Sequence, residues 1–254
     1  MADVVSIAEA RGRAGVRVVA IPGVPSPWTE AAKGLLHVKG VPYVLARPGA
    51  DEAPDAARAW VGDVGVPAFV VDEERPRTGW AEILLRTERL APEPALIPAN
   101  ASERALCFGL AHELCGEEGL GWTCRLLMIH TALEQPDVPG FPPEVGAYLA
   151  PRYGYTPGCA PAAKRRVLEL LALFSARLDG HRYLMQDRLT ALDVYLATFL
   201  TLLHPLPSEE MPMSELARAG YTCRDPELLA ALAPRLLDHQ RFVYERHLEL
   251  PVQL

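Results

Sequence analysis

A serine lies between two prolines at the point where an apolar run gives way to a helical pattern. Residues 16–21 read VRVVAI, which is typical of a strand, and residues 29–38 have apolar side chains at helical spacing. Pro27 keeps Ser26 out of the helical conformation and itself suits the first position of a helix. We therefore expect the Ser26 hydroxyl at the positive end of a helix dipole, where an anion is favoured. An ordinary N-cap serine is the alternative, and taken alone the pattern favours it.

A second candidate is the pair Val66-Pro67, which opens the apolar run 66–71. Proline is an unusual residue in a strand, because it cannot donate to a neighbouring strand. We expect a cis Val66–Pro67 peptide bond, a feature that proteins keep for a purpose. Such a bond would present the backbone N–H and C=O of Val66 to a ligand. Together, the two features favour a binding role for Ser26 over that of an ordinary N-cap.

Metal chemistry is weakly supported by the helical stretch that begins at His112. His112-Glu113 opens like a zinc-protease helix, but Gly116 stands where the second histidine should be. A site made from His112, Cys115 and Cys124 would match no standard zinc spacing. We therefore expect no metal.

The same stretch, residues 112–122, holds three glycines within a helical pattern. His112, Glu113 and Trp122 could line a substrate pocket, or the stretch could be a structural kink that places Trp122 in the core. Both interpretations stay open. Trp28 could likewise line a cleft or simply pack.

The elements that must position these residues divide the chain in two. Up to residue 92, strand and helix patterns alternate, which indicates an α/β layer. After residue 98 no strand pattern appears, so we expect an all-helical domain over 99–254. The N-terminal domain is expected over 16–92, and residues 1–15 are expected to form a flexible tail. The strands are expected at 16–21, 41–46 and 66–71, with a weaker one near 75–78, and the helices at 29–38, 53–61, 80–90, 102–114, 122–134, 143–149, 164–178, 191–203 and 226–248 with a kink at Pro234.

Composition excludes several classes of function. The formal charge of −7 argues against a nucleic-acid partner, which would need clustered basic side chains. No apolar run is long enough to cross a bilayer, and the first fifteen residues lack a secretory signal, so we expect a cytoplasmic protein. The five cysteines contain no CxxC pair and are expected to be free and largely buried.

Three motifs together resemble the glutathione S-transferase superfamily, in its serine-type, bacterial-like form. Ser26-Pro27-Trp28 through Tyr43 resembles the entry sequence of that family, and Val66-Pro67 resembles its cis-proline strand. Thr190 and Asp193 have capping-box spacing, similar to the box that starts a buried helix in the helical domain of the family. The resemblance implies a thioredoxin-like N-terminal domain followed by an all-α domain.

The resemblance also implies a function. Ser26 would stabilise the thiolate of glutathione, Val66 and Pro67 would hold its cysteinyl part, and the thiolate would attack a small electrophile. Trp28, His112 and Trp122 are the expected substrate pocket. The family further implies a homodimer, with neither metal nor membrane nor nucleic acid.

One departure separates this chain from the family. Where the family has an acidic residue and a serine to bind the γ-glutamyl end of glutathione, this chain has Gly79 and Trp80. Asp72 or a carboxylate from a second subunit could substitute. The alternatives to conjugation are therefore a non-catalytic binding or scaffold protein, or another glutathione-dependent reaction such as isomerisation, dehalogenation or peroxide reduction.

Overall fold

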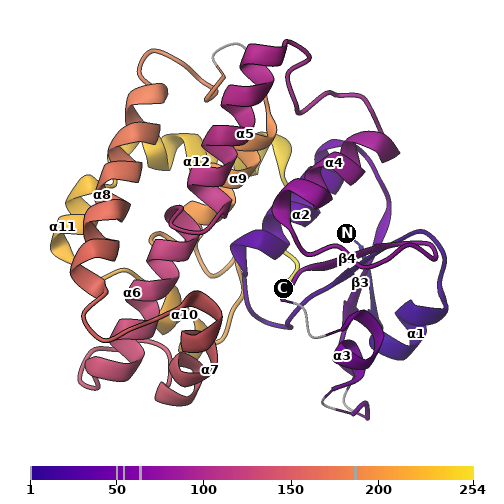
Figure 1. Ribbon diagram of the computed structural model, residues 1–254, viewed down its shortest axis with the longest axis horizontal. Coiled ribbons are helices and arrows are strands. Elements are labelled where there is room, and N and C mark those ends of the chain that lie inside the picture. The colour runs from indigo at the N-terminus through magenta and orange to yellow at the C-terminus, as the bar shows by residue number, and fades with distance from the viewer. Residues whose placement is uncertain (1, 50, 54, 63–64, 186–187) are drawn as a thin grey trace.

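The protein consists of a small α/β unit and a larger helical unit that pack side by side (Figure 1). The computed structural model describes residues 2–49, 51–53, 55–62, 65–185 and 188–254. The expected fold class, a thioredoxin-like N-terminal domain followed by an all-α domain, is confirmed. The strands are β1 (Asp3–Ser6), β2 (Val16–Val19), β3 (Tyr43–Arg47) and β4 (Ala68–Val71).

Helices alternate with the strands in the first unit and make up the second. Those of the α/β unit are α1 (Ile7–Gly12), α2 (Pro27–Val38), α3 (Ala56–Val61) and α4 (Trp80–Leu90). Those of the helical unit are α5 (Ala101–Cys115), α6 (Leu120–Glu134), α7 (Pro143–Tyr153), α8 (Ala160–Arg177), α9 (Ala191–Phe199), the 3-10 turn η1 (Leu200–Leu202), α10 (Glu215–Tyr221), α11 (Pro226–Ala231) and α12 (Pro234–His247).

The sheet orders its described strands β1-β3-β2-β4, with β4 antiparallel and the others parallel. Residues 3–12, expected from the sequence to belong to a flexible tail, instead form β1 and α1. β1 pairs with β3 from Asp3 to Ser6, and Ile7 and Ala10 of α1 are buried against the sheet. The expected strand near 75–78 is reduced to one bridge, between Arg77 and Phe69.

The two units share a core at the face of α2. Ala32 and Leu36 point toward the sheet, whereas Ala31 and Leu35 pack with the helical unit. α2 lies against α9, all of whose residues are buried. Because α2 belongs to both cores, its N-terminus is held firmly at the boundary between the units.

The capping box at the start of α9 is confirmed. Asp193 accepts hydrogen bonds from the backbone N–H of Thr190 at 2.8 Å and of Leu184 at 2.8 Å. The Thr190 hydroxyl also donates to the same carboxylate, at 3.1 Å. The box therefore satisfies the first turn of a helix that has no access to water.

Segments far apart in the sequence close the interface between the units. The buried Lys39 donates to the carbonyl oxygens of Ala91 at 2.7 Å and Pro94 at 2.9 Å, and so holds the connection between them. Lys33 pairs with Glu30 at 2.7 Å and donates to the carbonyl of Gln253 at 2.6 Å. The residues after α12 thus return to the α/β unit.

Several helix boundaries differ from the expected ones. α7 runs on to Tyr153 through Pro151, and the expected helix over 226–248 is divided into α11 and α12, with Pro234 at the first position of α12. α10 has no counterpart in the sequence prediction. No helix in the described parts of the chain is both long and apolar enough to span a membrane.

Candidate functional site

Ser26 is the N-cap residue of α2 by backbone position but not by hydrogen bonding. Its backbone is extended, with φ −61° and ψ 120°, and its carbonyl accepts the first helical bond from Glu30 at 2.8 Å. Its hydroxyl, however, makes no capping bond and has no hydrogen-bond partner among the described residues. The side chain is half-buried between the buried Pro25 and Pro27. The hydroxyl is therefore fixed in position and free to bind another group.

Val66-Pro67 lies at the same edge of the sheet as Ser26. The peptide bond is cis, as expected. β2 and β4 are antiparallel with Val19 opposite Ala68, so the chain leaving β2 toward Ser26 and the chain entering β4 meet at one edge. Within the described residues, the backbone N–H and C=O of Val66 make no hydrogen bond. The edge thus offers a free hydroxyl and a free peptide group.

Asp72 does not belong to this edge, which corrects the expectation that it could replace the missing carboxylate. It follows β4 at the opposite end, where it accepts a hydrogen bond from the backbone N–H of Gly15 at 2.7 Å. The length of the four-residue strand, roughly 10–13 Å, separates it from the Val66 end.

Three of the predicted site residues converge at the boundary between the two units. Trp28, Pro67 and Trp80 line a small cavity of about 10 Å³, which Tyr195 and Phe199 of α9 close from the helical side. That volume holds about one water molecule. The rings themselves therefore fill most of the space between the units.

Trp80 and Trp28 are held by specific contacts. The Trp80 ring packs 6.0 Å from the Tyr195 ring and 6.1 Å from the Phe108 ring. Trp28 donates from Nε1 to the carbonyl of Cys115 at 3.0 Å, and its ring meets the edge of Phe199 at 4.9 Å. Both tryptophans thus join the α/β unit to the helical unit.

The N-terminus of α4 contributes one residue that the sequence reasoning missed. Gly79 is the N-cap position of α4, with no side chain to cap it. Thr78, directly before it, lines the same cavity as Trp80 and is half-buried. Thr78 could have been identified from the sequence, because it lies close to the start of a predicted helix, as Ser26 does.

Trp122 and Trp28 come close to one another through a third ring. Tyr153, at the end of α7, lies 4.8 Å from Trp122 and 6.2 Å from Trp28, measured between ring centroids. Arg125, which is buried in α6, hydrogen-bonds to the hydroxyls of Tyr153 and Tyr221. The structure therefore joins two of the predicted pocket residues in one aromatic cluster.

His112 is not brought to this cluster. Its side chain is exposed on α5 and, within the described residues, makes no hydrogen bond, ion pair or ring contact. The ring lies over Gly116, where an added Cβ would come within 2.3 Å of it. Glu113 forms an ion pair with Arg166 of α8.

The glycines between α5 and α6 are explained by close packing. A Cβ on Gly119 would lie 2.7 Å from the carbonyl oxygen of His112, and one on Gly121 would lie 2.3 Å from the Phe199 ring and 3.0 Å from Trp28. Real Cβ atoms do not approach so closely. Because these positions are glycines, the first turn of α6 can pack against the last turn of α5 and against Trp28 of α2.

All five cysteines are free thiols, as expected, with Cys107, Cys115 and Cys124 buried and Cys159 and Cys223 partly buried. Burial raises the pKa of the Cys107 thiol to about 11. Among the residues that the structure describes, no group of three or more His, Cys, Asp or Glu side chains is placed to hold a metal ion.

Comparisons with known protein families and sequences give one match, in the helical unit. Residues 157–239 match the family model "Glutathione S-transferase, C-terminal domain". No curated protein sequence matches the chain.

Solved structures resemble the chain over nearly all of its length. A glutathione S-transferase domain-containing protein from Marinobacter aquaeolei VT8 has a TM-score of 0.63 at 19% identity, covering 91% of this chain and 98% of its own. A rice glutathione S-transferase in complex with glutathione has a TM-score of 0.58 at 17% identity, covering 94% and 93%. A glutathione transferase family member from Pseudomonas fluorescens Pf-5 with two glutathione bound has a TM-score of 0.55 at 14% identity, covering 92% and 97%. Residues 157–239 thus match the C-terminal domain of glutathione S-transferases, and the whole chain has a fold similar to that of these solved glutathione transferases.

Proposed function

We propose that the protein is a glutathione-dependent transferase that joins the glutathione thiolate to a small electrophile. The observation that carries the proposal is the unpartnered hydroxyl of Ser26 at the N-terminus of α2. A hydroxyl donor together with the helix dipole favours a thiolate over a thiol, and the thiolate is the nucleophile. Among similar folds, the rice and Pseudomonas proteins are described with glutathione bound.

The remaining parts of the tripeptide would be held by backbone and hydroxyl groups. The free N–H and C=O of Val66 can pair with the cysteinyl part of glutathione, next to Pro67. At the N-terminus of α4, the unpaired backbone N–H groups after Gly79 and the Thr78 hydroxyl can bind a carboxylate. The ammonium group has no carboxylate partner at Gly79-Trp80, so we expect weaker binding than a charge-assisted hydrogen bond there would give, by about 1.5–3 kcal/mol.

The electrophile would bind beside the aromatic cluster. Trp28 and Trp122 remain our proposal for its pocket, with Tyr153 joining them, because these rings lie between α2 and α6 on the helical side of Ser26. His112 is exposed and apart from the cluster, and we leave it out of the pocket.

Titration calorimetry with glutathione tests the proposal directly. We expect saturable binding at millimolar glutathione, and conjugation of a model aryl halide that Ser26→Ala slows at least tenfold. Ser214→Ala, at a capping serine far along the chain, is the matched control and should leave turnover unchanged. Absence of glutathione binding, or equal turnover in Ser26→Ala and the wild type, would refute the proposal.

A non-catalytic binding or scaffold role is the second candidate, and the packing of Trp80 favours it. Its ring occupies the boundary between the units, against Phe108 and Tyr195, and leaves a cavity of only about 10 Å³. This role predicts that glutathione does not bind and that Trp80→Ala lowers stability without affecting any turnover.

The proposal includes a homodimer, as the family resemblance implies, in which a second subunit is one source of a carboxylate for the ammonium group. Sedimentation velocity measures the assembly state. A monomer at concentrations where glutathione binds would remove that source.

A further inference from the structure

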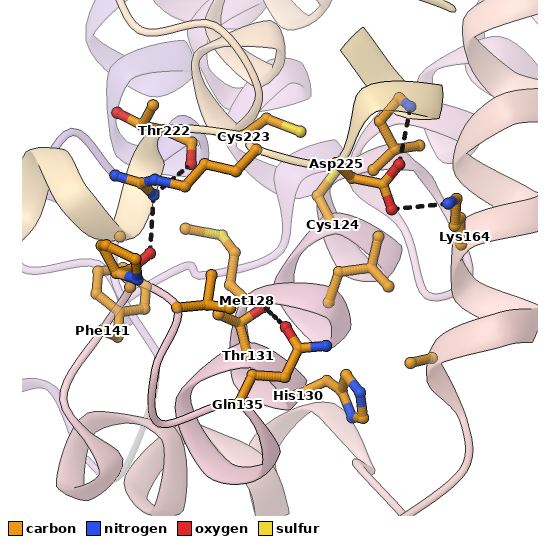
Figure 2. A pocket seen from close by; sticks show the side chains of 18 of the residues that line it. Cys124, Met128, His130, Thr131, Gln135, Phe141, Lys164, Thr222, Cys223 and Asp225 are labelled. Atoms are coloured by element: carbon orange, nitrogen blue, oxygen red, sulfur yellow. Dashed lines mark hydrogen bonds and ion pairs between the residues drawn. The ribbon is translucent and has the colours of Figure 1, made fainter.

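A second and much larger cavity lies wholly within the helical unit. Its volume is about 900 Å³, and its lining residues all fall between 124 and 228. It is bounded by the second half of α6, the segment 135–141, the first turn of α8, η1, and the segment from α10 to α11 (Figure 2). No lining residue comes from the α/β unit, so this cavity is separate from the Ser26 edge.

The floor of the cavity is apolar and reaches the main core. Cys124, Leu202, Leu203 and Leu228 line it and are nearly inaccessible to solvent, with exposed fractions of 1%, 2%, 5% and 3%. Toward the mouth the lining becomes accessible, and Val138 is 39% exposed. A molecule that enters from this side would bury apolar surface against a preformed floor, which is favourable.

Two cationic side chains around the mouth, Lys164 and Arg224, are held by other groups of the protein, whereas Asp137 is exposed there with no ion pair among the described residues. Lys164 contacts Asp225 at 2.7 Å and Glu227 at 2.8 Å. Arg224 donates from Nη1 to the carbonyl oxygen of Pro139 at 2.8 Å, which ties the segment before α7 to the segment before α11. The floor has no charged side chain, so an ion that reached it would be buried without a partner, which is costly.

Several polar uncharged groups of the lining are engaged within the protein. His130 shares a hydrogen bond of 3.1 Å with the Tyr155 hydroxyl, Thr131 is within 3.4 Å of the Gln135 amide oxygen, and the Thr222 hydroxyl donates to a backbone carbonyl of α10. Against the apolar floor, an extended peptide would bury its own N–H and C=O groups without partners, which is unfavourable.

Sulfur atoms and an aromatic ring make up much of the remaining wall. Met128, Cys124 and Cys223 line the cavity, and the ring of Phe141 lies beside Met128 (Figure 2). Burial raises the pKa of both thiols, so they are neutral at physiological pH. Neutral, polarisable sulfur packs favourably against aromatic rings.

We propose that this cavity binds one uncharged aromatic molecule of drug size, independently of glutathione. The volume lies in the range of pockets that hold such ligands. The apolar, uncharged floor disfavours an ion or an extended peptide, and the sulfur atoms of the wall favour an aromatic ring over an aliphatic chain.

The binding test uses the full chain and the uncharged fluorescent probe N-phenyl-1-naphthylamine. We expect saturable binding of one probe per chain, undisturbed by saturating S-hexylglutathione. That analogue carries an apolar group and so competes for both parts of the proposed glutathione and electrophile site. Displacement of the probe by S-hexylglutathione, or absence of saturation, would overturn the proposal.

A pair of double variants assigns the probe to the cavity. Ala160→Phe with Ala219→Phe fills the lining from α8 and α10, and we expect at least tenfold weaker binding. Ala162→Phe with Ala230→Phe changes two exposed alanines of α8 and α11 that do not line the cavity, and should bind the probe like the wild type. Equal affinities of the two folded variants would contradict the assignment.

Thiol protection tests the same assignment on the unmodified chain, so it does not depend on how the variants fold. Alkylation by N-ethylmaleimide is followed at Cys223, which lines the cavity, and at Cys159, which is also partly buried but does not. We expect the probe to slow the reaction of Cys223 at least fivefold and leave Cys159 unchanged. Equal rates at Cys223 with and without the probe would place the probe elsewhere.

Discussion

Replacing Ser26 with alanine distinguishes a helix cap from a thiolate-binding residue. An N-cap serine that accepts a backbone hydrogen bond stabilises a protein by about 1 kcal/mol relative to alanine. The Ser26 hydroxyl accepts no such bond, since α2 has no side-chain cap. We therefore expect Ser26→Ala to change the free energy of unfolding by less than about 0.5 kcal/mol, as a substitution without lost contacts does.

The same substitution should have a larger effect on bound glutathione. A hydrogen bond to a charged acceptor contributes about 1.5–3 kcal/mol, and a pKa difference of one unit corresponds to about 1.36 kcal/mol. Dividing the first by the second, the pKa of the bound thiol should rise by about 1–2 units in Ser26→Ala. The shift is measured by the ultraviolet absorbance of the thiolate as a function of pH.

Ser214 supplies the matched control for stability. It is the N-cap of α10, and its hydroxyl accepts from the backbone N–H of Ala217 at 3.2 Å. Urea unfolding should therefore show a loss of about 1 kcal/mol for Ser214→Ala and almost none for Ser26→Ala. Equal losses for the two variants, with no change in the thiol pKa, would show that Ser26 is an ordinary cap and that our reasoning is wrong.

Three further predictions concern stability. Gly121→Ala should lower the free energy of unfolding in urea by about 1–3 kcal/mol, because the new Cβ would lie 2.3 Å from an aromatic ring of α9. Gly109→Ala, which has open space around it, should be neutral or stabilising. Equal effects of the two substitutions would refute the packing explanation. Asp193→Ala should cost about 3 kcal/mol, because two backbone N–H groups lose their acceptor, while Asp179→Ala at an exposed ion pair should cost less than about 1 kcal/mol. Burial lowers the pKa of His239 from 6.5 to about 4, so its contribution is complete above pH 6.5 and is lost as the pH falls toward 4. His239→Gln should therefore remove up to about 3 kcal/mol of the destabilisation between pH 7 and 4. Parallel pH profiles of the variant and the wild type would contradict this. Asp193, whose pKa burial raises to about 6 and whose carboxylate lies 3.5 Å from His239 Nε2, loses its own contribution as the pH rises.

Local signals in the sequence were sufficient where the determinant is local. Ser26 between two prolines fixes the start of α2, and α4 has the predicted bounds because an amphipathic run ends at a proline-rich segment. Thr190 and Asp193 mark the start of α9 for the same reason. In each case the residues that decide the structure lie within one helical turn of each other.

Non-local pairing explains what the sequence did not reveal. β1 is a four-residue, half-polar segment whose pairing depends on β3, some forty residues away. The position of Asp72 follows from the antiparallel direction of β4, which no residue near Asp72 specifies. His112 has a plausible residue type for a pocket, but the rotation of α5 about its axis decides that it faces solvent.

The 900 Å³ cavity was the least predictable feature. Its lining comes from five separate segments, each of which has an ordinary sequence pattern. Arg224 ties the segment after α6 to the segment before α11, and Lys164 ties that same segment to α8, so the space is enclosed between them. Such a cavity is a property of assembled surfaces and has no sequence motif.

The contact between Lys33 and Gln253 has a consequence for synthesis on the ribosome. The α/β unit is complete once residue 90 has emerged, but the buried pair of Lys33 and Glu30 gains the carbonyl of Gln253 only after the helical unit has been translated. At about 5–20 residues per second, the intervening residues take roughly 10–30 s. During that time the nascent α/β unit presents the α2 face and its ion pair to water, so it depends on the arrival of the later residues to reach its final burial.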